Sequence, residues 1–427
     1  MTYAGRGISM FIYVVKMGES LFSIAAKYQV TMDSIRIANG LRMDGLVPGQ
    51  DLIIPSNVYT VQPGDSLYLI SQMSFIPTET IRLINGLESD ALTVGMELYL
   101  PPREKYEATN LSYLTATTQA NDQRLIQEFA PINTYLGIFE HHVFWEGNLS
   151  SLNAVQMTQE ARANHVAPLA VITNLTATGF SPELVSHILN TPEVSERLIT
   201  NIYNLVRNNN YAGVNIDFEG VPETDRDLFS AFLNTLRGRL QPEGYLTTVA
   251  VPAKMDDSLP WLRGYDYGGI GSAVDLVFIM AYDWHEAGSA PGPVAPISNV
   301  RKTIEYALNH MNRNKIILGV HNYGYDWTMS NGAVTNARAM SVSEAVETAL
   351  RYQVPIQYST EYQQPHFEYW DEAGMHIVWF ENPRSRAIKL QLVVDYRLGG
   401  IGEWQLALPF PQSPALVDYF LITKKVV

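Results

Sequence analysis

The stretch AGVNIDFEG at residues 212–220 alternates between apolar and polar side chains. Successive side chains of a β-strand point to opposite faces, so the apolar residues share one face and the polar residues share the other. The polar face carries Asn215, Asp217 and Glu219 and no basic residue. Burial of two carboxylates is unfavourable unless they are paired or used in chemistry. The stretch therefore predicts a core strand that presents two functional acids.

Seven further strand-like apolar runs accompany this one between residue 107 and the end of the chain, with amphipathic helical patterns between them. They are LSYLTAT (111–117), TYLGIFEHHV (134–143), APLAVITNL (167–175), LTTVAVPAK (246–254), VDLVFIMAYDW (274–284), KIILGVHNYGYDW (315–327) and GIGEWQLAL (400–408). Eight strands that each precede a helix predict an α/β fold, the TIM (β/α)8 barrel. Such barrels place catalysis at the carboxyl ends of their strands, where Asp217 and Glu219 are expected.

Residues 328–399 are too many for one helix between the seventh and eighth strands. We expect a small α+β insertion there, with a β-hairpin around Ala373-Gly374.

The N-terminal part contains an internal repeat, in which Tyr13–Pro55 aligns without gaps on Tyr59–Pro101. Ser20 and Ser66 stand at expected helix N-caps, and an Asn-Gly pair closes the second helical segment of each copy. Short strands that end at proline follow, so each copy predicts a βααβ unit. The predicted domains are an N-terminal extension (1–10), two modules (11–56 and 57–102) and the barrel (107–427).

The repeated frame Y-x-V-x-x-G-[ED]-S-L-x-x-I resembles the LysM module, which binds N-acetylglucosamine-containing polymers such as peptidoglycan and chitin. The resemblance covers residues 13–55 and 59–101, and it implies that both copies bind such a polymer. Two small interaction domains with another ligand are the alternative. If the modules only target the enzyme, removal of residues 1–105 should weaken binding to insoluble peptidoglycan and spare turnover of short soluble fragments.

The barrel region, residues 107–427, resembles the glycoside hydrolase family 18 domain of chitinase-like proteins. The family's fourth-strand signature D-G-x-D-x-D-x-E aligns with residues 212–219, where the last aspartate and the glutamate match and the earlier two aspartates are alanine and Asn215. The signature M-x-Y-D is intact as Met280-Ala281-Tyr282-Asp283, and Trp404 corresponds to the tryptophan that floors the sugar subsite.

This resemblance implies substrate-assisted retention, in which the substrate's own N-acetyl oxygen attacks the anomeric carbon. Glu219 would be the general acid, with a pKa raised toward neutrality, and would later activate water. Asp217 would hold the acetamide N–H, and Tyr282 would hydrogen-bond the acetamide oxygen. No metal or cofactor is required. Because Asn215 is neutral, one like charge is absent, which changes the pH profile more than the activity.

The resemblance and the strand-end positions indicate further substrate-binding candidates: Asn215, Met280, Asp283, Trp404, Tyr323, Tyr113, Glu140, Asn174 and Trp379. Packing within the barrel is an equal alternative for the last five. No metal site is expected, because His141 and His142 are adjacent on a strand and face opposite sides.

Composition limits the classes of function. The chain has 427 residues, no cysteine and a net charge of −14 at pH 7. The absence of cysteine excludes disulfides, zinc–thiolate sites and thiol nucleophiles. A strongly acidic chain without a basic cluster is repelled by nucleic acid. No run is long enough to span a membrane, and the N-terminus does not resemble a signal peptide. We expect a monomer.

Two glycan-binding repeats followed by this barrel resemble the spore-associated enzymes of Bacillus-type bacteria, which act on cortex peptidoglycan. The resemblance implies a spore protein at the coat and cortex, made in the mother cell without a signal peptide. It also implies an N-acetylglucosaminidase that cleaves β-1,4 bonds after N-acetylglucosamine. A chitinase with the same residues is the nearest alternative, and a non-catalytic spore-coat lectin is the alternative from another class.

Overall fold

The computed structural model describes residues 9–427. The extension predicted at residues 1–10 therefore lies outside the described residues except for Ser9 and Met10. Both are buried, and Ser9 donates from its N–H to Asn57 Oδ1 at 2.7 Å and from its hydroxyl to Pro101 O at 2.6 Å. These two residues belong to the folded modules.

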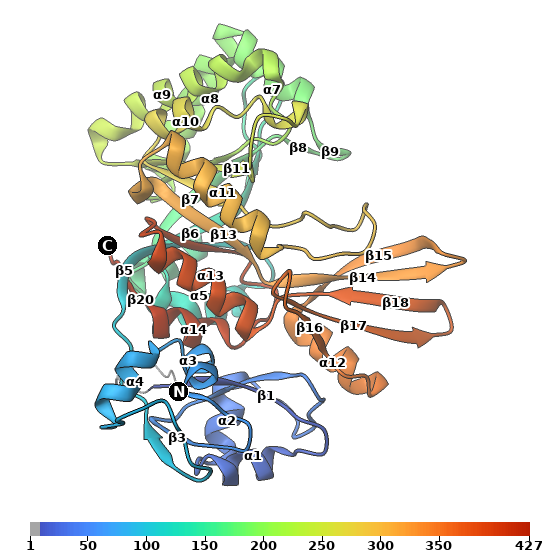
Figure 1. Ribbon diagram of the computed structural model, residues 1–427. Coiled ribbons are helices and arrows are strands. Elements are labelled where there is room, and N and C mark those ends of the chain that lie inside the picture. The colour runs from blue at the N-terminus through green and yellow to red at the C-terminus, as the bar shows by residue number, and fades with distance from the viewer. Residues whose placement is uncertain (1–8) are drawn as a thin grey trace.

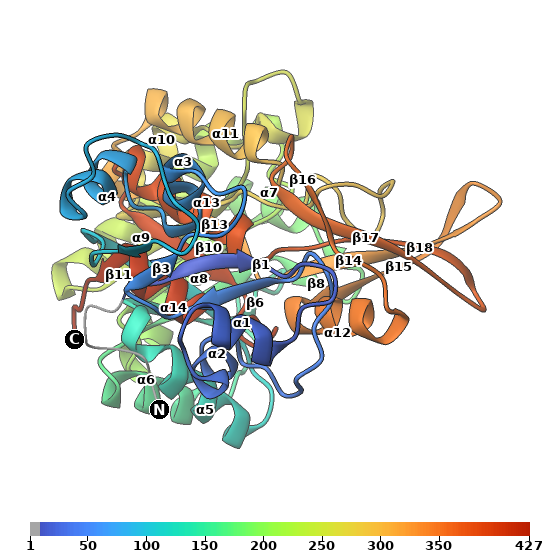
Figure 2. The same ribbon diagram turned by 60° about the horizontal axis from the view of Figure 1, so that its bottom comes forward.

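The prediction of a closed eight-stranded parallel barrel is confirmed (Figures 1 and 2). The strand order is β19-β13-β12-β11-β10-β7-β6-β5, and β19 pairs with β5 to close the ring. The strands are β5 (Tyr106–Thr115), β6 (Tyr135–His142), β7 (Ala167–Thr173), β10 (Gly213–Asp217), β11 (Leu246–Pro252), β12 (Leu276–Met280), β13 (Ile316–His321) and β19 (Gly400–Trp404). Only β5 begins ahead of its predicted run.

Helices surround this barrel on the outside (Figure 1). They are α5 (Gln119–Phe129), α6 (Val155–Ala163), α7 (Pro182–Asn190), α8 (Pro192–Asn208), α9 (Arg226–Leu240), α10 (Tyr267–Ala273), α11 (Ile297–His310), α13 (Pro383–Asp395) and α14 (Ser413–Phe420). A short strand β20 (Leu421–Thr423) adds to the start of β5.

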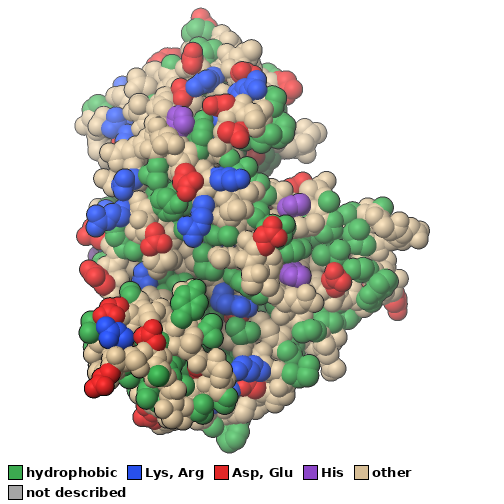
Figure 3. All heavy atoms as spheres, viewed as in Figure 1, with side chains coloured by type: hydrophobic (Ala, Val, Ile, Leu, Met, Phe, Trp, Pro, Cys, Tyr) green, Lys and Arg blue, Asp and Glu red, His purple; other side chains and the backbone are tan. Residues whose placement is uncertain are grey.

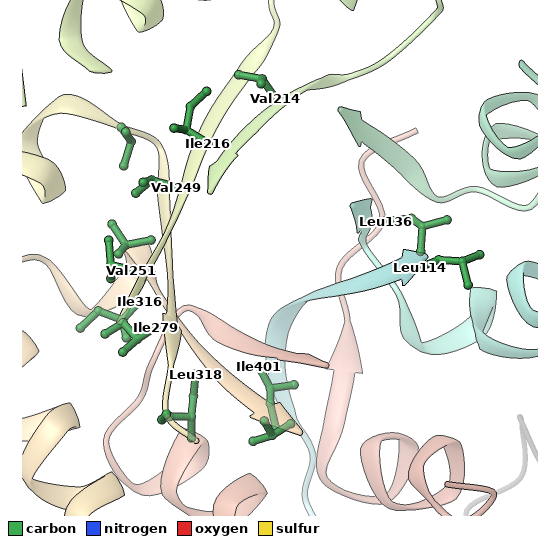
Figure 4. Close-up of a cluster of buried hydrophobic side chains, with 14 of the residues drawn as sticks. Leu114, Leu136, Val214, Ile216, Val249, Val251, Ile279, Ile316, Leu318 and Ile401 are labelled. Atoms are coloured by element: carbon green, nitrogen blue, oxygen red, sulfur yellow. The ribbon is translucent and has the colours of Figure 1, made fainter. Parts of the chain in front are cut away.

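The alternation of side chains along β10 decides which residues reach the barrel interior. Val214 and Ile216 belong to the core cluster between strands and helices that Figure 4 draws, together with Val249 and Val251 of β11. A separate cluster of apolar and aromatic side chains, including Phe278, fills the inside of the barrel. Asn215 and Asp217 are therefore on the inner face, as the period of two predicts.

The predicted insertion is a five-stranded antiparallel sheet with one helix, and it projects from the carboxyl end of the barrel (Figure 1). Its elements are β14 (Tyr323–Ser330), β15 (Ala333–Ser341), α12 (Val342–Tyr352), β16 (Gln357–Ser359), β17 (Gln364–Asp371) and β18 (Gly374–Trp379). Asp371 pairs with Gly374, which confirms the hairpin at Ala373-Gly374. β14 follows β13 almost directly, so the seventh apolar run spans two strands.

Both N-terminal modules have the expected βααβ order. The first module contains β1 (Phe11–Val14), α1 (Leu21–Lys27), α2 (Met32–Asn39) and β2 (Asp51–Ile54), and the second contains β3 (Val58–Thr60), α3 (Leu67–Ser74), α4 (Thr78–Ile84) and β4 (Glu97–Tyr99). Ser20 and Ser66 accept the predicted N-cap hydrogen bonds. Edge-on contacts of Phe11 with Tyr28 and Tyr59 join the modules through one aromatic core.

A buried ionic cluster fastens α13 to the barrel. Lys389 Nζ lies 2.9 and 2.8 Å from the two carboxylate oxygens of Glu381, and Arg386 lies 3.5 Å from Glu403 on β19. Arg386 also donates to the backbone oxygen of His321 at 2.7 Å. Burial alone would raise the pKa of Glu381, but the cations Lys389 and Arg386 hold it below its usual range. This cluster links the last strand, the seventh strand and the insertion.

Candidate active site

The two acids predicted on one face lie at the carboxyl end of β10. The strand ends at Asp217, and Glu219 stands two residues beyond it, just before the turn at Gly220, whose φ is +74°. Asp217 is 6% exposed, and its Oδ1 has no hydrogen-bond partner among the described residues. The pair is thus held at the barrel mouth, where a substrate can supply the missing partner.

Burial and like charge shift the protonation of both acids. Burial, and then the negative charges of Glu219 and Glu140, raise the pKa of Asp217 well above its usual value. Burial, and then the charge of Asp283, raise the pKa of Glu219 to about 7. A carboxylic acid with such a pKa can donate a proton near neutral pH, as a general acid must.

The backbone at Glu219 lies beyond the end of β10, and side chains rather than a neighbouring strand make its hydrogen bonds. Asn174, at the end of β7, accepts from the N–H of Glu219 at 2.8 Å and donates to its backbone oxygen at 2.8 Å. Tyr265, which sequence reasoning missed, donates to the backbone oxygen of Phe218 at 2.9 Å. The Asn174 side chain is fully buried. The structure therefore places Asn174 behind the acid, where it fixes the Glu219 backbone.

A neutral hydrogen-bonded chain lies beneath the acids. Tyr113 of β5 donates to Asn215 Oδ1 at 3.1 Å, and the Asn215 amide donates to Thr248 Oγ1 at 2.8 Å. All three side chains are buried. Thr248 was missed, since one threonine within the apolar run of β11 gives no signal of its partner. These hydrogen bonds satisfy the Asn215 side chain without adding a charge below Asp217.

The M-x-Y-D signature crosses the barrel mouth after β12. Met280 ends the strand and packs, with Tyr282, against the inner core cluster. Asp283 accepts from Tyr323 Oη at 2.8 Å to both of its oxygens and from Tyr325 Oη at 3.2 Å. Burial, and then the charges of Tyr113, Asp283, Asp217 and Glu219, raise the pKa of Tyr282 well above its usual value, so it remains a hydroxyl donor.

Aromatic rings and one further carboxylate complete the predicted set. Trp404, at the end of β19, packs its ring against Phe139 at 4.8 Å and Tyr113 at 5.6 Å between centroids. Glu140 of β6 accepts from Thr173 Oγ1 at 2.6 Å. Trp379 ends β18 in the insertion and stacks on His366, with ring centroids 4.4 Å apart.

The structure thus brings together most of the residues predicted for the site. Short-range electrostatic effects connect Asp217, Glu219, Glu140, Tyr282 and Asp283 with one another. Trp379 lies in the inserted sheet, where it pairs with Tyr325 of β14. Within residues 9–427, no group of three or more histidine and acidic side chains is arranged to hold a metal ion.

Residues 98–408 match glycosyl hydrolases family 18, and residues 13–55 and 59–101 each match the LysM domain. The chain belongs to glycosyl hydrolases family 18. Both resemblances stated from the sequence are confirmed.

Several similar proteins match this chain over nearly its whole length. The provisionally named sporulation-specific glycosylase YdhD of Bacillus subtilis is 49% identical over 98% of this chain and 100% of its own length. A cortical fragment-lytic enzyme of the same organism is 42% identical over 97% of this chain and 99% of its own. The crystal structure of the Bacillus cereus spore cortex-lytic enzyme SleL has a TM-score of 0.89 and 35% identity, and it covers 98% of this chain and 99% of SleL.

The Asn174→Ala variant should lower kcat about 10- to 100-fold with little change in KM, because displacement of a catalytic group by a fraction of an ångström has effects of this size. The matched control is Asn85→Ala. Asn85 makes the same two-point contact with the backbone of Tyr99, at 2.9 and 2.7 Å, within the second module. Steady-state kinetics on a soluble fragment measure both. Equal effects of the two changes would contradict a positioning role for Asn174.

Proposed function

We propose that this family 18 enzyme hydrolyses β-1,4 bonds after N-acetylglucosamine in spore cortex peptidoglycan, by a substrate-assisted retaining mechanism. The single observation that carries the proposal is the buried pair at the end of β10. Burial, and then the charge of Asp283, raise the pKa of Glu219 to about 7, and Asp217 Oδ1 has no hydrogen-bond partner among residues 9–427. The charges of both acids act on the buried Tyr282 hydroxyl, and we propose that this donor, the acceptor Asp217 and the acid Glu219 surround one substrate position.

In the proposed first step, the Glu219 carboxyl group donates its proton to the glycosidic oxygen, while the substrate's acetamide oxygen attacks the anomeric carbon and displaces the leaving group. The coupled pair shares one proton in this step: with the proton on Glu219, ionised Asp217 accepts the acetamide N–H, and its negative charge stabilises the oxazolinium ion. Tyr282 donates to the acetamide oxygen. In the second step, ionised Glu219 removes a proton from water, which opens the oxazolinium ring with net retention.

Asn215 limits where the proton of Asp217 can go. Its amide is engaged with Tyr113 and Thr248, and an amide cannot accept a proton at neutral pH. A proton that leaves Asp217 therefore moves toward Glu219 or the substrate. We propose that the two acids titrate as one coupled pair in this enzyme.

The remaining predicted residues form the proposed sugar-binding surface. Trp404 offers a ring face to a pyranose, which is the contact that aromatic side chains make with apolar sugar faces. Met280, Asp283 and Tyr323 border the acetamide position, and Glu140 and Trp379 are proposed to contact neighbouring sugars.

The wider setting is also part of the proposal. We propose that the protein acts as a monomer at the spore coat and cortex and is made in the mother cell. Acidic and basic side chains are interspersed over the face shown in Figure 3, which fits a neutral glycan better than nucleic acid. Among residues 9–427, no helix has the length and apolarity that crossing a bilayer requires.

Replacement of the acid tests the chemistry. The Glu219→Gln variant keeps the shape of the side chain but cannot donate a proton, so release of reducing ends should fall at least about 100-fold. The control Glu223→Gln alters an exposed acid in the short 3-10 helix that follows (Glu223–Asp225) and should keep wild-type activity.

Reducing ends should be counted on cortex fragments and on chitin oligomers in parallel. Glycan release that survives Glu219→Gln would disprove the assignment of the acid. Preference of the wild type for chitin oligomers would make the protein a chitinase with the same site.

The pH profile tests the electrostatics. Glu219 must be protonated to act, so kcat/KM should fall as the pH rises through about 7. The Asp283→Asn variant removes a negative charge that raises the pKa of Glu219, so the alkaline limb should move to lower pH. Asp256→Asn, in an exposed loop, serves as the control and should leave the limb in place. An unmoved or upward-shifted limb in Asp283→Asn would contradict the proposed coupling.

A further inference from the structure

The two LysM modules are copies in sequence but differ in how they meet the rest of the chain. Three apolar side chains of the first module are buried in the core cluster of the barrel, Ile12, Ala38 and Ile53, with exposures of 2%, 5% and 1%. The matching positions of the second module are Val58, Ile84 and Tyr99, which are exposed by 37%, 51% and 41%. The same face is therefore covered in one copy and open in the other.

A buried ion pair accompanies this contact. Asp51 on β2 is 4% exposed, and its Oδ2 lies 2.9 Å from Nε of Arg384 in the first turn of α13. Burial raises the pKa of Asp51, and Arg384 opposes that rise. The matching residue of the second module, Glu97, is exposed and accepts a hydrogen bond from Gln29 of the first module. Loss of the Arg384 partner would leave a carboxyl group buried beside the barrel.

The backbone of the first module also touches the insertion. The N–H of Ile356 donates to Pro48 O at 2.9 Å, and a Cβ atom on Gly49 would lie 1.8 Å from Ile356 O. Gly95 occupies the matching position in the second module with nearly the same φ, +84° against +83°, and a Cβ atom there would meet nothing within 4 Å. Val47 adds its side chain to the core cluster of the insertion. Figures 1 and 2 both show the first module beside α12.

These contacts reach elements that shape the catalytic site. Ile356 immediately precedes β16, and Arg384 follows β18 by a short turn. The first module therefore contacts the chain at both ends of the β16–β18 segment. In the inserted sheet β18 pairs with β14, and Tyr323 and Tyr325 of β14 donate to Asp283. Asp283 in turn raises the pKa of Glu219. A continuous set of packed elements therefore runs from the first module to the general acid.

We infer that the first LysM module is a fixed part of the catalytic unit, which braces the inserted sheet so that β14 holds Asp283 beside Glu219. Its residues are positioning residues, since none of them touches the reacting atoms. The inference changes one expectation from the sequence, that removal of residues 1–105 spares turnover of short soluble fragments. That removal should instead lower turnover, because it exposes a core face of the barrel and leaves Arg384 without its partner.

The inference rests on the proposed function, because its readout is hydrolysis of a soluble cortex fragment too short to bind a module and the barrel at once. The experiment compares two single variants of the full-length protein, Gly49→Ala and the control Gly95→Ala. Both changes place the same strain on a left-handed glycine, so only the contact with Ile356 distinguishes them. We expect Gly49→Ala to lower kcat at least about five-fold with a smaller change in KM, and Gly95→Ala to remain within about two-fold of the wild type.

The pH profile separates bracing from a general loss of stability. If β14 loosens, its tyrosines support the Asp283 anion less well, the pKa of Glu219 falls, and the alkaline limb of kcat/KM should move to lower pH in Gly49→Ala alone. Hydrogen exchange should rise around residues 356–359 and 383–386 in the same variant. Identical kinetics, pH limb and exchange in the two glycine variants would overturn the inference.

A second pair decides the question if Gly49→Ala does not fold. Asp51→Asn should also move the alkaline limb to lower pH, and the matched control Glu97→Gln should not. The double variant Asp51→Asn/Arg384→Gln should move the limb part of the way back toward its wild-type position. An alkaline limb at the same pH in all of these variants would overturn the bracing role of the first module. A wild-type chain that leaves soluble cortex fragments intact would instead refute the proposed function, so the two failures are distinguishable.

Discussion

Two carboxyl groups stand at the buried end of β10, and no basic side chain contributes to the pKa shift of either. Water is displaced from both, so each resists ionisation, and the charge of one raises the pKa of the other. The surroundings follow from this constraint. A neutral amide lies below the pair, aromatic rings line the wall, and the backbone of Glu219 is bonded to Asn174 rather than to a neighbouring strand. The site keeps a proton available instead of neutralising its acids with cations.

The ionic cluster beside α13 shows the opposite solution within the same barrel. Glu381 is as deeply buried as Asp217, yet Lys389 and Arg386 lie beside it and lower its pKa. Burial lowers the pKa of His321 in this cluster to about 3, so its ring is neutral. Compensated charges of this kind fasten elements together, whereas uncompensated ones remain reactive. The difference between the two sites is the presence of cations on the facing helix.

The barrel and its acids could be predicted because their signal is local. A period of two along nine residues assigns Asp217 and Glu219 to one face, and eight apolar runs of similar length indicate the ring of strands. The role of Asn174 could not be predicted, because a strand-end position suits a sugar ligand and a backbone clamp equally. Its partner is also distant in the chain and adjacent only after β7 and β10 pair. Thr248 and Tyr265 were missed for the same reason.

The docking of the first LysM module was hidden by the repeat itself. Ile53 and Tyr99 occupy one position of the frame and both suit a short strand, but one is buried in the barrel core and the other is exposed. An internal repeat predicts that its copies share a fold, but it does not predict what each copy packs against. The two modules are therefore equivalent in sequence and differ in their contacts.

The pKa values of the β10 pair test the account most directly. Carboxyl ¹³C NMR of the wild type beside Glu219→Gln would follow the two acids as the pH changes. The account predicts one carboxyl signal that titrates near pH 7 and disappears in the variant, against an ordinary carboxyl pKa of about 4. Titration of both acids below about pH 5 would contradict it, because the pair would then be ionised at neutral pH and could not supply the proton.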